Sequence, residues 1–141
     1  LAGGFLTEHW LDQPDPGFLF ENRSLIKYRL IVDEFGGWDY FQTLLKTVKV
    51  IAEKHGVSMS TVAARYVLDQ PQVGAVIIGA RYAHHLPQTL SIFELSLNPD
   101  DYAALEAVLA KRHGPSGYVY ELESDRTGRH GSIMKYNLNA L

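Results

Sequence analysis

The run from Val73 to Arg81, with the sequence VGAVIIGAR, holds the residues whose types and spacing best suit the binding of a phosphate. Gly79 lacks a Cβ atom, so a ligand can approach the backbone closely at this position. Arg81 carries a planar, permanently charged guanidinium group that matches the oxygens of a phosphate. A strand that ends in a glycine and an arginine, followed by the start of a helix, therefore predicts a phosphate-binding turn with a nucleotide cofactor as its ligand.

The elements that must position this turn follow from apolar spacing and from local start and stop signals. Val73–Ile78 is predicted to be a buried parallel strand, because the continuous Val and Ile run indicates that both of its faces are covered. Apolar residues at three- and four-residue steps predict helices in the rest of the chain. These helices are Leu25–Phe35, stopped by Gly36-Gly37; Trp38–His55, ended at Gly56; one capped by Ser58 or Ser60; Tyr82–Phe93, with Pro87 in its first turn; and one starting at Asn98-Pro99-Asp100-Asp101.

The fold class follows from these elements. Helices that flank strands indicate an α/β layer architecture with parallel strands. The chain offers two strands, Leu1–Phe5 and Val73–Ile78, with a long helical crossover between them. Because two strands do not make an independent sheet, the α/β prediction requires more strands than these 141 residues supply.

The composition of the chain excludes several classes of protein and of site. Its length suits one domain, and its formal net charge of −3 argues against a general binder of nucleic acid or of anionic membranes. The absence of cysteine excludes disulfides, thiolate metal sites and cysteine nucleophiles. No apolar run approaches the ~20 residues that span a bilayer. The start, LAGGFL, lacks a basic segment and a long apolar core, so we expect no targeting sequence, a cytoplasmic protein and a chain cut from something larger.

Four segments taken together resemble the carboxyl-terminal part of an aldo-keto reductase. They are LAGGFLT, NRSLIKY, IAEKHGVSMSTVAARYVL and VIIGAR followed by a helix, and the similarity extends from Leu1 to about Leu109. The resemblance implies a (β/α)8 TIM barrel that binds NADP(H) and reduces carbonyl groups. Because such a barrel takes about 250 residues, this chain would be an incomplete one. Residues 1–112 would form a partial barrel with strands 7 and 8, their helices and an added terminal helix, and residues 113–141 a carboxyl-terminal tail.

The resemblance also implies which residues contact the NADP cofactor. One group would lie against the pyrophosphate, a second would hold the 2′-phosphate of the adenosine, and a third would contact adenine. In that order they are Leu1, Ala2, Gly3 and Arg23; Gly79 and Arg81; and His85, Gln88 and Thr89.

The adenine positions depart from the pattern of the family. His85 stands where the family often has Gln, and Gln88 and Thr89 stand where it often has Glu-Asn. Gln88 can still form hydrogen bonds with adenine, whereas Thr89 cannot offer both amide groups. The resemblance thus supports the phosphate contacts more fully than the adenine contacts.

The resemblance implies no catalytic residue in this chain. The family reduces carbonyls with an Asp, a Tyr, a Lys and a His from the first half of the barrel, and nothing here occupies those positions. Lys27 and Tyr28 do not replace them, because adjacent residues on a helix point about 100° apart. We therefore expect the cofactor-binding half of an NADP(H)-dependent reductase, inactive as this chain alone, that takes an aldehyde or ketone when the barrel is complete.

Two further functions are considered beside the reductase. One is a non-catalytic, NADP-binding regulatory subunit of the same fold, like the barrels that serve potassium channels, because fold does not settle function. The other is a helix-turn-helix DNA-binding module within Lys54–Leu68, whose recognition helix offers Arg65 as its one cation. No metal is expected, since the adjacent His84 and His85 diverge on a helix. Exposed apolar edges of an incomplete barrel predict self-association.

The tail carries a basic strip that is expected to be solvated. It consists of Arg126, Arg129, His130 and Lys135. His55, His113 and His130 are dispersed along the chain and are expected to lie at the surface.

Overall fold

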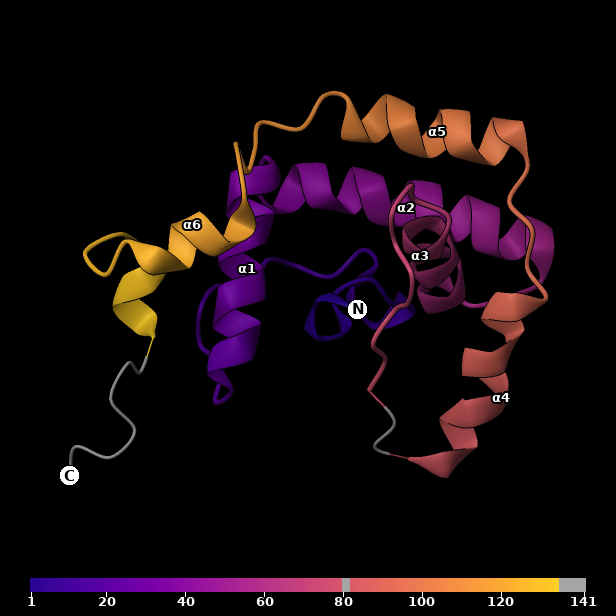
Figure 1. Ribbon diagram of the computed structural model, residues 1–141, viewed down its shortest axis with the longest axis horizontal. Helices are drawn as coiled ribbons and strands as arrows, with labels where there is room; N and C mark the ends of the chain where they lie inside the picture. Colours follow the sequence, from indigo (N-terminus) through magenta and orange to yellow (C-terminus); the bar gives the residue numbers. More distant parts are fainter. Residues whose placement is uncertain (80–81, 135–141) are drawn as a thin grey trace.

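Helix α2 (Trp38–His55) is the element on which the other long helices pack. The computed structural model describes residues 1–79 and 82–134 of the chain. Within them, α1 (Arg23–Phe35), α3 (Met59–Leu68) and α5 (Pro99–Leu109) all contact α2. Figure 1 shows α5 running beside α2 in the opposite direction, with α1 and α3 leaving α2 on its other side. The described residues therefore form layers of helices around one central helix.

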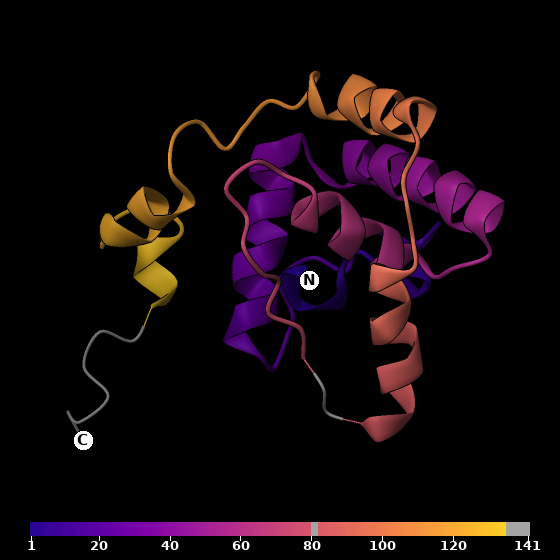
Figure 2. The same ribbon diagram turned by 45° about the vertical axis from the view of Figure 1, so that its right-hand side comes forward.

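The remaining elements are short and lie around this helical group. The chain start and residues 119–133 each lie beside α1, and residues 83–93, between α3 and α5, lie to one side of the molecule (Figures 1 and 2). The short elements are η1 (Ala2–Gly4), η2 (Glu8–Trp10), η3 (Ala83–His85), α4 (Leu86–Leu90), η4 (Ser91–Phe93), α6 (Val119–Ser124) and η5 (Gly131–Ile133).

Local signals set the ends of the long helices, as the sequence predicts. Gly56 ends α2 in the left-handed region, at φ 64°, and its N–H donates to two carbonyls of the last turn. The Ser58 side chain accepts a hydrogen bond from the Thr61 N–H at 3.2 Å and caps α3. At α5, Asn98 and Asp101 form a reciprocal capping box around Pro99. These helix boundaries are confirmed.

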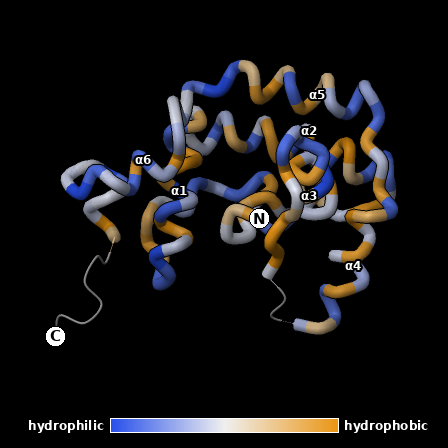
Figure 3. Tube along the Cα trace, in the orientation of Figure 1, coloured by the Kyte–Doolittle hydropathy of each residue, from blue (hydrophilic) through white to orange (hydrophobic). Residues whose placement is uncertain are grey.

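The core joins an aromatic cluster to an aliphatic seam. Phe5 is fully buried, and its ring stacks on Trp10 with 5.0 Å between ring centroids. Three more rings meet Phe5 edge-on, from Phe20, Trp38 and Phe41. The seam continues between α2, α3 and α5, where Figure 3 shows apolar residues in orange. Its buried members include Leu45, Val48, Ile51, Met59, Val62 and Leu105.

The prediction of an α/β fold, as the carboxyl-terminal part of a (β/α)8 TIM barrel, is wrong, because the described residues contain helices and no strand. Residues 73–79 are extended, but among the described residues their one hydrogen bond is from the Val73 N–H to the Gln70 carbonyl. A strand needs a neighbour to complete its ladder, and residues 1–79 and 82–134 supply none beside this segment. Ile77 is 96% exposed, so the apolar run does not indicate burial on both faces. The expected strand Leu1–Phe5 is instead a tight turn with φ of 44° at Ala2 and 61° at Gly3.

A buried guanidinium joins the loop before α1 to α1 and α2. The Arg29 side chain is only 4% exposed, and its Nε donates to Asp15 Oδ1 at 3.0 Å. Its two terminal nitrogens donate to Asp15 and to Asp33, one turn further along α1. The Arg29 hydrogen bond is the main reason that the pKa of Asp15 is lowered. The guanidinium carbon also lies 5.1 Å from the ring centroid of Phe18 and 5.5 Å from that of Trp38.

We predict that Arg29→Ala lowers the free energy of unfolding by about 3 kcal/mol, because two carboxylates and two aromatic rings lose a desolvated partner. Arg29→Lys should recover less than half of this loss, since an ammonium group cannot bind Asp15 through two parallel hydrogen bonds. Urea unfolding followed by circular dichroism measures both effects. Arg112→Ala, at an exposed arginine that bonds its own helix end, is the control. Equal stability of Arg29→Lys and the unchanged protein would contradict the bidentate role.

A second charged group pins the start of α5 to the end of α2. Asp101 is 3% exposed, and its carboxylate accepts hydrogen bonds from Lys54 Nζ and His55 Nε2, both at 2.7 Å. Burial of this carboxyl disfavours its charged form. The hydrogen bonds from Lys54, the Asn98 N–H and His55 outweigh that effect and lower the pKa of Asp101 to about 2. At the other end of the helix pair, the Tyr40 hydroxyl donates to the Val108 carbonyl at 2.6 Å.

The low pKa of Asp101 makes the stability of the fold depend on pH. Because the folded pKa of about 2 lies below the ordinary value of 3.8, the stabilisation is fully present above pH 3.8 and is lost as pH falls through 2. It amounts to about 2 kcal/mol. The difference in unfolding free energy between the unchanged protein and Asp101→Asn should therefore shrink between pH 4 and pH 2. Asp100→Asn, at the exposed neighbour in the same helical turn, should show no such dependence in the same urea titrations.

Within residues 1–79 and 82–134, every helix is too short or too polar to cross a lipid bilayer.

Candidate functional site

Three of the predicted cofactor residues lie together around one small cavity. Leu1 at the chain start, and Gln88 and Thr89 in α4, line a space of about 50 Å³ together with Ile78, the residue before Gly79. The structure therefore brings together the chain start, the end of the extended segment and α4. Because ligand pockets usually hold 300 Å³ or more and a water molecule takes about 30 Å³, this cavity is a contact point and not an enclosed nucleotide site.

Hydrogen bonds fix α4 at this point. The Gln88 carbonyl accepts from the Ser91 hydroxyl at 2.7 Å and from the Thr61 hydroxyl of α3 at 3.3 Å. Thr61 itself is buried. Among the residues that the structure describes, the side-chain amide of Gln88 forms no hydrogen bond, and the residue is exposed. The backbone of Gln88 is therefore held in place, while its amide is available to a ligand.

A larger apolar cavity lies next to the small one, beneath the extended segment. Its volume is about 410 Å³, and it shares Ile78, Thr89 and Ile92 with the small cavity. Its other walls are Leu68, Gly74, Ala75, Val76 and Phe93. None of these side chains is charged, so this space suits a flat apolar group better than a phosphate.

The glycines of the predicted site have different roles in the structure. A Cβ atom on Gly3 would lie 2.7 Å from Tyr28 Cδ2 and 2.9 Å from Leu25 Cδ2, so packing against α1 already requires a glycine here. Ala2, beside it, is part of the same tight turn. Around Gly79, by contrast, a Cβ would meet no described atom within 4 Å. Packing within the described chain therefore explains Gly3 and leaves Gly79 without a structural reason.

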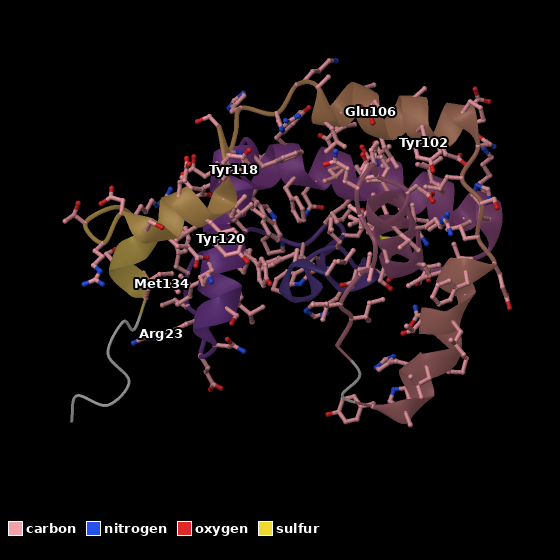
Figure 4. The ribbon with its side chains drawn as sticks, viewed as in Figure 1. Arg23, Tyr102, Glu106, Tyr118, Tyr120 and Met134 are labelled. Carbon is pink, nitrogen blue, oxygen red and sulfur yellow. The ribbon has the colours of Figure 1, made fainter. Side chains whose placement is uncertain are left out.

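Arg23 and His85 line neither of these two cavities. Arg81 lies outside the described residues. Arg23, labelled in Figure 4, is the first residue of α1, and its Nη1 donates to the Ile133 carbonyl at 3.2 Å. His85 is exposed at the end of η3, with its ring 4.1 Å from that of His84. Among the nine predicted cofactor contacts, Leu1 thus lies near Gln88 and Thr89 of α4. Arg23 instead contacts Ile133.

The tail segment, residues 116–134, packs on α1 through charged contacts that the sequence did not predict. Lys27 Nζ lies 2.6 Å from Glu123 Oε1, and Arg23 reaches Ile133. Further along α1, Arg129 pairs with Asp33 at 2.5 Å and His130 Nε2 lies 3.1 Å from Glu34 Oε1. Each partner is more than 90 residues away in the sequence, so no local pattern could reveal these pairs.

Arg126 and Arg129 are exposed, as expected of a solvated strip, but the expected surface positions of His130 and His55 are wrong. His130 is buried, with 6% exposure, and His55 is half-buried against Asp101. Only His113 of the three is exposed. Lys135, the last member of the basic strip, lies outside the described residues. A histidine is an amphipathic side chain, and its burial here follows from a long-range partner that the sequence does not reveal.

The structure also bears on the expectations about DNA binding by α3 and about a metal site. Much of α3, the expected DNA-recognition helix, is covered, including Thr61, Val62 and Ala64. Its one cation, Arg65, donates to Asp69 at 2.8 Å. Within the described part of the chain, no three side chains of metal-ligating type come together.

We predict that salt releases the tail segment from α1. At 1 M NaCl the screening length falls to about 3 Å, so the pair of the exposed Arg129 should lose most of its attraction and the half-buried pair of Lys27 part of it. Amide hydrogen exchange in residues 119–133 should then accelerate several-fold, and Arg129→Ala should accelerate it at low salt. Amides of α2 serve as the internal control because apolar packing holds them. Unchanged exchange of the tail in salt would show that apolar contacts retain it.

The comparisons with known proteins identify the family of this chain. The family model described as the aldo/keto reductase family matches residues 1–110. Flagellar radial spoke protein 5 of Chlamydomonas reinhardtii is 36% identical over 70 residues, which is 48% of this chain and 13% of that protein. The chain therefore spans a small part of the length of this relative. The resemblance expected from the sequence is confirmed, and the chain belongs to the aldo/keto reductase family.

Proposed function

We propose that this chain supplies the adenine end of an NADP(H) site in an oxidoreductase that reduces aldehydes or ketones. Membership of the aldo/keto reductase family supports the reaction class. The convergence of Leu1, Gln88 and Thr89 on one cavity is the observation that carries the assignment of the site. The nicotinamide would supply the hydride, and the protein would bind and orient the cofactor.

The residues at this site fit the adenosine part of the cofactor in their chemistry. The exposed amide of Gln88 has both a donor and an acceptor for the edge of adenine. The Thr89 hydroxyl can add one further hydrogen bond, and the apolar walls beside Ile78 suit a flat ring. Gly79 leaves open space that a Cβ would occupy. Arg81 would hold the 2′-phosphate and so favour NADP over NAD, and Arg23 would reach the pyrophosphate only after leaving the Ile133 carbonyl.

We also propose that hydride transfer requires catalytic residues from outside these 141 residues. The family's Asp, Tyr, Lys and His set has no match in the sequence at its expected positions. Lys27, which lies beside Tyr28, is paired with Glu123 and does not face the cavity of Leu1 and Gln88. The chain by itself is therefore expected to bind the cofactor without turning over a carbonyl substrate.

The direct test is a titration of the chain with NADPH and with NADH, followed by the fluorescence of the reduced nicotinamide. We predict that Arg81→Ala weakens NADPH binding at least tenfold and leaves NADH binding unchanged, because a hydrogen bond to a charged group contributes about 1.5–3 kcal/mol. Gln88→Ala should weaken both cofactors equally, since adenine is common to them.

Arg112→Ala is the matched control for the arginine variant, because Arg112 is exposed and its Nη1 donates to the Leu109 carbonyl at its own helix end. Absence of saturable NADPH binding would overturn the proposal for this chain. Equal loss of NADPH and NADH affinity in Arg81→Ala would remove the 2′-phosphate assignment.

A second candidate is a non-catalytic, NADP-binding subunit of a larger assembly. It is favoured by the 36% identity with a protein whose name places it in a flagellar radial spoke. The two candidates are distinguished by whether the natural protein that contains this chain reduces a carbonyl substrate. Oxidation of NADPH that depends on an added aldehyde supports the reductase, and cofactor binding without such oxidation supports the subunit.

A further inference from the structure

A separate cavity of about 310 Å³ lies between α1 and the tail segment. Ser24, Lys27, Tyr28 and Ile31 of α1 line one side of it, and Tyr120 and Glu123 of α6 lie opposite. None of these residues is among the predicted cofactor contacts. We propose that this cavity binds a small, uncharged, ring-shaped molecule that carries a hydroxyl group. The proposal is independent of the proposed cofactor site.

The charges at the cavity favour an uncharged ligand. Lys27 Nζ and Glu123 Oε1 are 2.6 Å apart and neutralise each other. His130, which also lines the cavity, lies with its Nε2 3.1 Å from Glu34 Oε1. An anion entering the cavity would meet the Glu123 carboxylate, and a cation would meet the Lys27 ammonium group. Either charge would bind well only after breaking the existing pair, which is a cost that a neutral molecule avoids.

The walls of the cavity favour a ring. Ile31 and Val119 are apolar, and Tyr28 and Tyr120 add two aromatic rings. Tyr28, Val119 and Tyr120 remain partly or largely exposed in the structure, so a ligand that covers them removes apolar surface from water. Aromatic rings attract another ring in stacked or edge-on geometry. The volume lies at the lower end of the range for ligand pockets, which limits the molecule to one or two rings.

Hydroxyl groups at the cavity favour a ligand that carries its own hydroxyl. Among the described residues, the hydroxyls of Ser24, Tyr28 and Tyr120 form no hydrogen bond. Each is both a donor and an acceptor, so together they can satisfy a ligand hydroxyl in either direction. A purely apolar ring would cover these groups without replacing their water, and it would bind less well.

Three probes that share one ring and differ in charge test the proposal at pH 7. They are 4-hydroxybenzyl alcohol, which is neutral, 4-hydroxybenzoate, an anion, and 4-hydroxybenzylamine, a cation. Chemical-shift changes of backbone amides, recorded during titration of the full chain, locate and measure the binding. We expect the alcohol to bind with a dissociation constant on the order of 1 mM, and to shift amides of α1 and α6. We expect both charged probes to bind at least fivefold more weakly.

Two variants make the test specific. Val119→Trp fills the cavity and should abolish the shifts, whereas Val50→Trp, at an exposed position of α2, should leave them unchanged. Glu123→Gln removes the charge that repels an anion and leaves Lys27 to attract it. This variant should bind 4-hydroxybenzoate about tenfold more tightly than the unchanged protein does, a gain that unfolding cannot produce.

The proposal is overturned if the alcohol shifts amides outside α1 and α6, or if Val119→Trp retains its binding. It is also overturned if 4-hydroxybenzoate binds as tightly as the alcohol to the unchanged protein.

Discussion

The buried guanidinium of Arg29 is the contact on which the arrangement of the first third of the chain depends. It joins Asp15 in the irregular loop to Asp33 in α1, and it lies over the rings of Phe18 and Trp38. A charge buried in this way is stable only when its partners are held in place. The loop, α1 and the start of α2 must therefore take up their positions together. The same group extends to the tail, because Asp33 also binds Arg129, whose guanidinium lies 5.3 Å from the Phe18 ring centroid.

Features that depend on neighbours in the sequence could be predicted, and those that depend on distant partners could not. The cap at Asn98, the glycine end of α2 and the cap at Ser58, one of the two serines that the sequence allowed, each involve residues within four positions of one another, and the structure confirms them. The strand at Val73–Ile78 failed because a strand exists only beside another strand. An apolar run indicates that a segment tends to be buried, but it does not show that a second strand lies beside the segment. The contacts of His130 and Arg129 with α1 were missed for the same reason.

The candidate site also combines features that could be predicted from the sequence with features that could not. The order of four segments along the chain was sufficient to recognise the family, and residues 1–110 match it. The structure also brings Leu1 next to Gln88 and Thr89, which are far apart in the sequence. The sequence could not show that Gly3 is needed for contact with α1, or that Arg23 is bonded to the tail. Gly3 and Arg23 thus have contacts within the fold in addition to any contact with a ligand.

The solvated backbone of residues 74–79 has a consequence for how the chain can be divided. Proteases bind their substrates as extended segments, and exposed segments without backbone pairing are where they cut. A cut here would separate α3 from α5 in the sequence. Asp101 would still bind Lys54 and His55, and Tyr40 would still bind Val108, so the two pieces would remain associated. We therefore expect the two fragments to stay associated after a cut within residues 74–79.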